Sequence, residues 1–556
     1  MIIKNWCCLI GEISTFRRAL SRLFIVVLCL VGLFPFVTNA TVNDFQGVEK
    51  QLSQRNFVKK QQAIEWVIKT QPAQSEQLFT GLLAGEVYYH RKNSQIYFID
   101  SLEQGQLAIR LFDTTQVEVE NKRDFRKVGL NNRLRSVIRL GIAKIHLGSE
   151  SEAQRLAAAK SLLGNSSSTV ISLVKAAYSV EVSSRVKEYL ALILAMDQLK
   201  SDNGELRYQA IETLSDSLEP AVFRAINSAL DVEQAKAAPD PVFVKQLEQA
   251  ITSYQQSQRV YDVAETLFFG LSLGSVLVLA GIGLAITFGV MGVINMAHGE
   301  LIMLGAYTTY VIQQLMPNHI GLSLAVSIPA AFIVSGLVGI AIERGVIRFL
   351  YGRPLETLLA TFGISLILQQ AVRSIFSPLN RSVITPDWMT GMLEINPMLS
   401  LTYNRLYIVI FCLMVFTALV LVLKKTPLGL QVRAVSQNRS MAKAMGVRSE
   451  WVDAMTFGLG SGVAGVAGVA LSQLTNVGPN MGQSYIIDSF MVVVFGGVGN
   501  LWGTLVAGLT LGMFNKILEP WAGAVLAKIL VLVFIILFIQ KRPRGLFPQR
   551  GRAVEG

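Results

Sequence analysis

The apolar and polar positions divide the chain into two halves. Residues 41–260 are polar and rich in Gln, Glu, Lys and Arg, whereas residues 263–541 contain repeated apolar runs of about 20 residues. A run of that length is what a helix needs to cross the hydrocarbon core of a bilayer. The pattern predicts two domains, one soluble and one embedded in a membrane.

The membrane half contains nine apolar segments. The seventh of them has about 12 residues, so we expect a half-span or part of a re-entrant hairpin there. The predicted fold class is an all-α polytopic membrane protein with about eight or nine membrane segments and discontinuous helices. The segments lie near 265–287, 298–316, 321–342, 357–376, 405–424, 452–474, 486–497, 500–518 and 522–540.

The polar half changes its pattern along the chain. "GEVYYH" and "SQIYFI" flank "RKN" and predict a hairpin, to which "QLAIRLF" can add a third strand. From about residue 131, "SEAQRLAAAKSLL", "SSRVKEYLALILAMDQL" and "ELRYQAIETLSDSL" have apolar residues at helical spacing. Their repetition suggests a HEAT-like helical domain at 41–260 that carries a small β element. The alternative is an irregular helical bundle that acts as a spacer.

The N-terminus resembles a secretory signal. Four basic residues precede an apolar core at 23–36, and Thr38 and Ala40 occupy the small-residue cleavage positions. We therefore expect a signal peptide at 1–40, with an uncleaved signal anchor as the alternative. Either one places residue 41 outside the cytoplasm.

The basic residues support this orientation. With residue 41 outside, the loop 343–356, the loop 424–451 and the tail from residue 541 fall inside, and together they carry fourteen Lys and Arg residues. The long outside loop 377–404 carries one, Arg381. This asymmetry predicts that the N-terminal domain lies outside the cytoplasm, that a membrane domain spans 261–548, and that the tail at 549–556 lies in the cytoplasm.

Composition excludes several classes of protein. The net charge of +12 is concentrated in loops next to apolar runs, which argues against nucleic-acid binding. Three of the four cysteines lie in the expected signal and the fourth is Cys412, so neither a disulfide framework nor a cysteine metal site is expected.

Catalytic motifs are also missing from the sequence. "GNLWGT" at 499–504 lacks the lysine of a phosphate-binding loop, and no His belongs to an H-E-x-x-H pair. "GLSLG" at 270–274 matches a nucleophile elbow around Ser272, but it opens an apolar helix where that motif requires a strand-to-helix turn. We expect no catalytic residue, no metal and no directly bound cofactor.

Polar residues interrupt the apolar stretch "GVINMAHGELIMLGAY". Asn295, His298 and Glu300 lie within six residues of one another. One interpretation is a helix end near the cytoplasmic face, with Asn295 as the cap and Glu300 in the first turn. The other is a discontinuous helix that faces the transport path. The two are compatible, and they differ in how deep the break lies.

Glycines mark two further sites. In "GLGSGVAGVAG", Gly460, Gly465 and Gly468 recur at about helical spacing and indicate close helix packing. "FGGVGN" should break a helix, and broken backbone must line a cavity or be buried in protein. The remaining substrate-path candidates are therefore Gly496, Gly497, Gly499 and Asn500.

A short helix is expected in the inside loop "KKTPLGLQVRAVSQNRSMAKAMGVRSEW". Ser436 or Asn438 can cap it, and Gly446 suits its C-terminal end. An apolar face on such a projecting helix can dock in a partner's groove; the alternative is a solvated loop. The apolar face comprises Met441, Ala444 and Met445, and the basic face comprises Arg439 and Lys443.

These motifs resemble a known family. The stretches "GLSLGSVLVLAGIGLAITFGVMGVINMAHGELIMLGAY", "TPLGLQVRAVSQNRSMAKAMGV", "VVVFGGVGNLWGTLVAG" and "RPRGLFP" are similar to branched-chain amino-acid ABC permeases of the LivH type, over about 263–548. The secreted extension at 41–260, with "NVGPNMGQSYIIDSFMVVVFGG", resembles the urea ABC transporter permease subunit of the UrtB type.

The resemblance implies an importer subunit for urea in the lipid of a bacterial inner membrane, with 261–548 as the permease domain and the N-terminal domain in the periplasm. It implies pairing with a second, LivM-like permease, two cytoplasmic ATPases that use ATP, and a periplasmic substrate-binding protein. The segment 432–446 matches the coupling loop toward the ATPases, although Arg433 and Ala434 stand where the consensus has Glu-Ala-Ala. Branched-chain amino acids or short amides are the alternative substrates. A membrane-anchored receptor or hydrolase is the alternative of another class.

Overall fold

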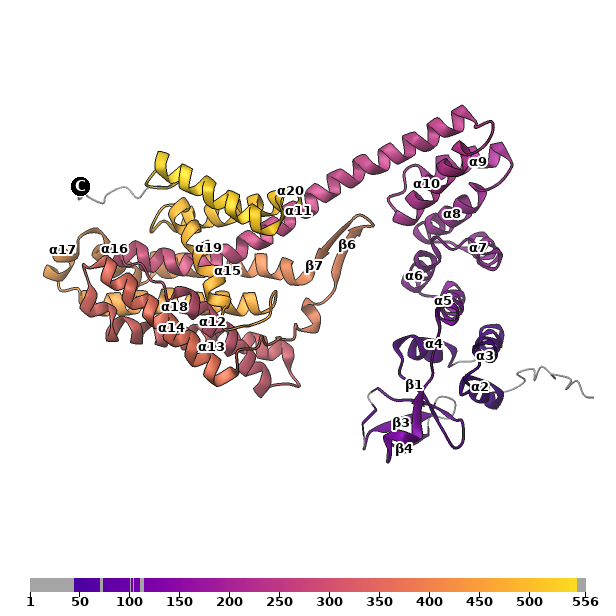
Figure 1. Cartoon of the computed structure of the whole chain (residues 1–556), viewed down its shortest axis with the longest axis horizontal. Coiled ribbons are helices and arrows are strands. Elements are labelled where there is room, and N and C mark those ends of the chain that lie inside the picture. The colour runs from indigo at the N-terminus through magenta and orange to yellow at the C-terminus, as the bar shows by residue number, and fades with distance from the viewer. Residues whose placement is uncertain (1–44, 71–73, 101, 104, 111–114, 548–556) are drawn as a thin grey trace, which may run out of the picture. The chain divides into compact units, whose positions relative to one another are not determined.

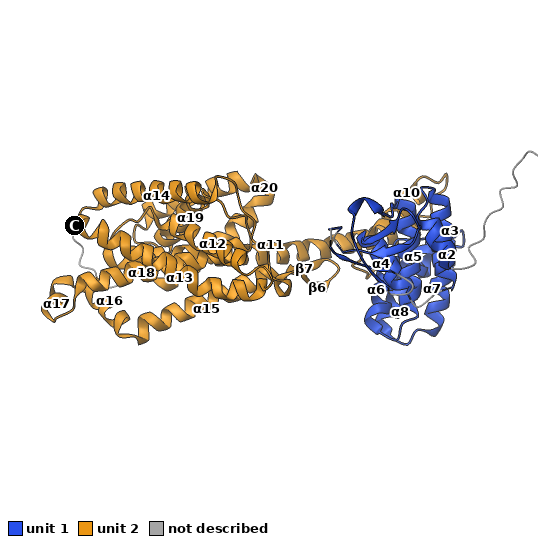
Figure 2. Ribbon diagram, turned by 90° about the horizontal axis from the view of Figure 1, so that it is seen from below, with its two compact units in different colours: residues 1–214 blue, residues 215–556 orange. Residues whose placement is uncertain are grey.

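The computed structural model describes residues 45–547 apart from 71–73, 101, 104 and 111–114. The expected signal peptide, its three cysteines and the tail 549–556 lie outside the described residues. The chain forms two compact units, residues 1–214 and 215–556 (Figure 2).

The first unit begins with three helices and a small antiparallel sheet. The predicted strands are confirmed as β1 (Val87–His90), β2 (Ile96–Phe98) and β3 (Leu107–Arg110), in the order β4-β3-β2-β1-β5. The sequence pattern missed β4 (Gln116–Glu118) and β5 (Phe125–Lys127). Apolar side chains of the sheet and helices share one core. The helices are α2 (Phe45–Leu52), α3 (Phe57–Thr70) and α4 (Ser75–Ala84).

Five consecutive helices follow. The three predicted helical stretches correspond to α6, α8 and α9 (Figure 1). α5 precedes them, and α7 lies between α6 and α8. The apolar residues at helical spacing pack into a core that includes Ala159, Val174 and Leu190. The bounds are α5 (Asn132–Leu147), α6 (Glu152–Leu162), α7 (Ser168–Val180), α8 (Ser184–Gln198) and α9 (Gly204–Leu214).

The second unit starts with α10 (Pro220–Gln234) and the long helix α11 (Pro241–Met291). Asp240 caps α11 by accepting hydrogen bonds from the amides of Val242 and Phe243. The helix is polar at first and apolar and buried from Gly270 onward. Residue 260 lies within this unbroken helix, so the position at which the soluble domain ends stays a prediction.

Six helices in the described residues are long and apolar enough to cross a membrane. Their pattern confirms a multi-pass membrane protein. They are α11, α13 (Ile320–Gly345), α14 (Pro354–Phe376), α15 (Tyr403–Lys425), α18 (Ser449–Ser472) and α20 (Leu501–Lys541).

The other expected segments are also helical. α12 (His298–Leu315) and α19 (Met481–Gly496) are short, and α20 contains two helical stretches on either side of Gly523. These stretches coincide with the expected segments near 500–518 and 522–540. The loop before α15 contains a hairpin that the sequence pattern missed, β6 (Met392–Asn396) and β7 (Leu399–Thr402).

The glycines of α18 lie where neighbouring helices touch it. A Cβ at Gly460 would meet the backbone of Gly283 in α11, and a Cβ at Gly468 would overlap the carbonyl oxygen of Ile302 in α12. Their absent side chains let α18 lie directly against α11 and α12 at the centre of the unit.

Candidate functional site

The break between α11 and α12 lies deep in the helical unit. His298, the first residue of α12, places its Nε2 2.8 Å from the carbonyl oxygen of Ala280. Ala280 precedes the end of α11 at Met291 by eleven residues, or about 16 Å of helix. The imidazole of His298 therefore lies about 16 Å from the end of α11, which is about half of the ~30 Å thickness of a hydrocarbon core, and residues 293–297 run back toward it.

Asn295 lies at the base of this break and is fully buried. Its Oδ1 accepts a hydrogen bond of 3.0 Å from the amide of Ala297, one residue before α12 begins. Asn295 thus satisfies the backbone just ahead of the helix, close to the expected capping role. Its Nδ2 has no hydrogen-bond partner.

Glu300 lies in the first turn of α12, where the helix dipole favours an acid. Its side chain is buried, and Oε1 accepts a hydrogen bond of 3.1 Å from the Ser365 hydroxyl of α14. Oε2 has no hydrogen-bond partner, and neither has Nδ1 of the buried His298. Three side chains around the start of α12 thus each keep one unpaired polar atom.

The motif "FGGVGN" forms a different place in the fold. Gly497 and Gly499 have φ values of +103° and +80°, so they adopt backbone that favours glycine and end α19. Asn500 then caps α20 by accepting hydrogen bonds from the amides of Trp502 and Gly503. The broken backbone is thus compensated within the protein.

The C-terminal segment covers this glycine turn. The amide of Leu546 donates to the Phe495 carbonyl (2.9 Å) and that of Phe547 to the Gly496 carbonyl (3.2 Å). Gly499 lies against Gly289 of α11, nine residues or about 13 Å beyond Ala280. The structure thus separates the seven path candidates into one group at the α12 break and one at this turn.

The inside loop forms α16 (Pro427–Gln437) and the six-residue α17 (Arg439–Ala444), which projects at one end of the second unit (Figure 2). Asn438 accepts a hydrogen bond of 2.9 Å from the Met441 amide, and Gly446 has φ +88° at the C-terminal end. Met441 and Met445 are 60% and 80% exposed, and Ala444 is exposed with them.

An ion pair, a cation–ring contact and hydrogen bonds attach this loop to the neighbouring helices. Arg439 pairs with Asp453 of α18, and its guanidinium lies 3.9 Å from the ring centroid of Tyr351. Arg433 donates to the Leu423 carbonyl, and the Ala434 carbonyl accepts the Asn438 amide. The loop is therefore held at its base while its methionines point outward.

Sequence reasoning missed one ion pair of the membrane helices. Lys528 Nζ of α20 lies 3.2 Å from the buried Oδ2 of Asp488 in α19. Asp488 is the single acid between Asp453 and Glu519, so its isolation in an apolar run was the available signal.

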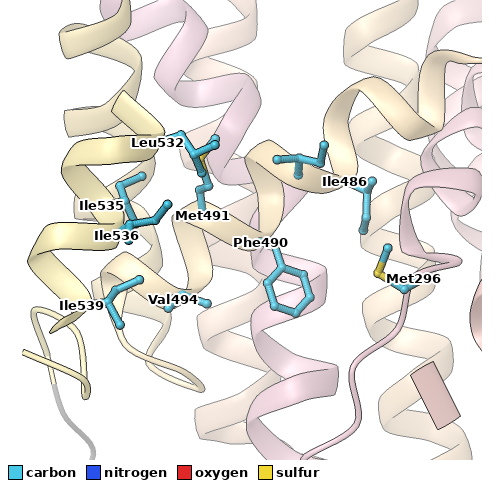
Figure 3. Close-up of a pocket in the computed structure, with 10 residues that line it drawn as sticks. Met296, Ile486, Phe490, Met491, Val494, Leu532, Ile535, Ile536 and Ile539 are labelled. Atoms are coloured by element: carbon cyan, nitrogen blue, oxygen red, sulfur yellow. The ribbon is translucent and has the colours of Figure 1, made fainter. Parts of the chain in front are cut away.

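An apolar groove of about 300 Å³ lies beside the break (Figure 3). Met296 borders it on one side, and apolar side chains of α19 and the second half of α20 border it on the other. Its lining comprises Met296, Ile486, Ile487, Phe490, Met491, Val494, Leu532, Ile535, Ile536 and Ile539.

Similarity to known proteins agrees with this architecture. The sequence profile described as the permease component of the branched-chain amino acid transport system matches residues 266–539. The chain belongs to this family. It is an ABC transporter permease subunit and not an enzyme.

Curated relatives of the permease match over nearly their whole length. The high-affinity branched-chain amino acid permease protein LivH of Salmonella typhimurium is 30% identical over 302 residues, which cover 52% of this chain and 97% of the relative. BraD of Pseudomonas aeruginosa is 28% identical over 296 residues, which cover 52% of this chain and 96% of BraD.

A more distant similarity covers only part of another permease. The ribose import permease protein RbsC of Bacillus subtilis is 32% identical over 108 residues, which are 18% of this chain and 34% of that protein. No solved structure matches the chain significantly.

Proposed function

We propose that this chain is the permease subunit of an ATP-driven importer for urea. It forms one half of the path and pairs with a second, LivM-like permease. Two cytoplasmic ATPases use the ATP, and a periplasmic binding protein delivers the solute. The chain itself binds no cofactor.

The break at α12 is the observation that carries this proposal. Three buried polar atoms without hydrogen-bond partners lie in the first turn of α12 and the residues just before it. They are the amide nitrogen of Asn295, the Nδ1 nitrogen of His298 and the Oε2 oxygen of Glu300. Urea is small, neutral and rich in hydrogen-bonding groups, so donors and acceptors at membrane depth suit it. The glycine turn with Gly496, Gly497, Gly499 and Asn500 is proposed as the cytoplasmic end of the path.

The exposed methionines of α17 support the proposed coupling to ATPases. A short helix with an exposed apolar face fits a groove on a partner. Met441, Ala444 and Met445 supply that face, and Arg433, Ala434, Asn438, Arg439 and Gly446 hold it in place.

The charge asymmetry supports the proposed orientation. Basic residues concentrate on the side of α17 and the C-terminus, which we assign to the cytoplasm of a bacterial cell. The N-terminal unit then lies in the periplasm. We propose that its consecutive helices form a HEAT-like domain.

Branched-chain amino acids are the second candidate substrate. The groove beside Met296 is lined entirely by apolar side chains, which suit a branched aliphatic group better than urea.

Uptake measurements separate the two substrates. Cells that lack the chain and cells that carry it receive labelled urea and labelled leucine in parallel. We expect the deletion to abolish high-affinity urea uptake and to leave leucine uptake unchanged. Normal urea uptake with lost leucine uptake would overturn the urea assignment in favour of the second candidate.

A further inference from the structure

Buried polar residues recur at every fourth position of α14. Thr357, Thr361, Ser365 and Gln369 are each 5% exposed or less, and Arg373 continues the series. Positions four apart lie on the same side of a helix, so they form one polar face. The opposite side is open, because Leu359 and Ile367 are 69% and 68% exposed.

This polar face contacts the break between α11 and α12. The Thr361 hydroxyl accepts a hydrogen bond of 3.2 Å from the Met296 amide in the break before α12. The Ser365 hydroxyl donates to Glu300 in the first turn of α12. Successive turns of α14 thus contact the break before α12 and then the first turn of α12.

The C-terminal part of the polar face contacts the residues just before α19. Gln369 Nε2 donates to the Pro479 carbonyl (3.2 Å) and to Oδ1 of Asn480 (3.1 Å). Arg373 Nη2 donates to the same Asn480 Oδ1 at 2.7 Å. Asn480 immediately precedes α19, so α14 joins the beginnings of two short helices.

A second observation points to a solute here. Oε2 of the buried Glu300 has no partner, and a Cβ at Gly482 would lie 2.8 Å from it. Glu300 Oε2 is therefore directed toward the start of α19. Ser365 contacts α12 and Gln369 contacts the residues just before α19, so this oxygen lies where α12 and α19 begin. A buried acceptor without a partner is costly unless a donor from water or a ligand reaches it.

We propose that the polar face of α14 is a movable wall of the transport path, and that Ser365 and Gln369 contact the solute together with Glu300. This inference rests on the proposed import function. Side-chain hydrogen bonds to Glu300 and Asn480 close the wall, and bonds to a hydrogen-bonding solute or to water replace them when α14 moves. The ligand class is a small solute with N–H donors, which Glu300 Oε2 accepts.

Thiol labelling of the assembled transporter in membranes tests the proposal. The parent carries Cys412→Ser, and its residual labelling is subtracted. Ser365→Cys and Gln369→Cys are introduced singly, with Ile367→Cys as the matched control on the open side of the same helix. A charged, membrane-impermeant thiosulfonate is added with and without ATP.

We expect Ser365→Cys and Gln369→Cys to react about tenfold faster than Ile367→Cys in one nucleotide state, because only a water-accessible thiol ionises readily. We also expect excess solute, urea or leucine, to slow this labelling. Labelling no faster than that of Ile367→Cys in both states would overturn the proposal. The labelling needs no knowledge of the substrate, so a failed urea assignment is distinguishable from a failed wall assignment.

A kinetic readout keeps the proposal testable if the cysteine variants assemble poorly. Gln369→Leu should raise the KM for uptake about tenfold, as expected for one lost polar contact. Ile367→Leu should leave the KM unchanged. A normal KM for Gln369→Leu in a transporter of normal abundance would also overturn the proposal.

Discussion

The imidazole of His298 donates a hydrogen bond to the backbone carbonyl of Ala280, and this contact fixes the depth at which α12 begins. The carbonyl belongs to the interior of α11, eleven residues before that helix ends. A polar side chain and a mid-helix carbonyl thus position the re-entrant segment 293–297.

Removing this contact should destabilise the permease. We expect His298→Ala to lower stability by about 1–3 kcal/mol, because the buried donor and its packing are lost. His298→Gln retains a donor and should lose less. Thermal unfolding of the purified transporter measures both variants, and equal stability of His298→Ala and the parent would contradict the prediction.

Helix packing at Gly468 predicts a second effect. Gly468→Val should cost about 1–3 kcal/mol, because its Cβ would overlap the Ile302 carbonyl oxygen and neither backbone can move freely. Gly363→Val is the matched control, since nothing lies within 4 Å of a Cβ there. Yield and melting temperature of the complex distinguish the two. Comparable losses in both variants would argue against a packing role.

The α17 loop predicts uncoupling. Met445 is exposed and Gly446 has positive φ, so Met445→Asp combined with Gly446→Pro should place a charge on the docking face and distort its end. We expect uptake to be lost and ATP hydrolysis to continue without a response to solute, while membrane insertion is retained. Val180→Asp, on an equally exposed position of the first unit, should leave both unchanged. Preserved coupling in the double variant would exclude the docking assignment.

The ion pair within the membrane helices predicts an asymmetric response. Asp488 is buried, whereas the Lys528 side chain is 57% exposed. Lys528→Met therefore leaves a buried acid unpaired and should destabilise the permease more than Asp488→Asn. In the Asp488→Asn variant, the side chain of Lys528 can extend to the membrane–water interface. The double variant should recover part of the loss. A double-mutant cycle on melting temperatures measures the coupling, and additive effects would show that the pair is not energetically linked.

Acid should loosen the first unit around Glu181. Burial raises the pKa of this carboxyl, but hydrogen bonds from Arg155 and from the amides of Ser183 and Val182 outweigh it and hold the pKa below 4.5. The folded state then binds fewer protons than the unfolded state, so this stabilisation is present above about pH 4.5 and is lost as pH falls through the folded pKa.

Hydrogen exchange of the full-length chain measures this pH effect. Protection of α6, α7 and α8 in the parent should fall as the pH is lowered from about 5 to about 3, because the folded pKa of Glu181 lies below its ordinary value of 4.5. Glu181→Gln should show a smaller decline from a lower starting value. An unchanged slope in that variant would assign the acid sensitivity to other groups.

Most of the membrane helices followed from the sequence because length and apolarity alone specify them. All nine expected segments are helical in the structure, including the two stretches that meet at Gly523. The depth of the α12 break did not follow, because it depends on the contact between His298 and Ala280, which a pattern of apolar residues does not encode.

The candidate site was predicted only in part. Asn295, His298 and Glu300 were visible as polar groups in an apolar run, whereas their partners on α14 were not singled out. The signal was present, since Thr361, Ser365 and Gln369 recur every four residues in an apolar helix. The glycines of "FGGVGN" identified a break correctly. Their contact with Leu546 and Phe547 could not be predicted, because those residues are about 50 positions away in the sequence and no local pattern links them.

The continuity of α11 has a mechanical consequence. The polar stretch from Pro241 to about residue 263 extends the membrane helix by about 35 Å without a proline or glycine joint. A stiff rod of that length converts a tilt of about 5° within the bilayer into a displacement of about 3 Å at its far tip. A rearrangement around His298 that tilts α11 would therefore be enlarged at the Pro241 end of this helix.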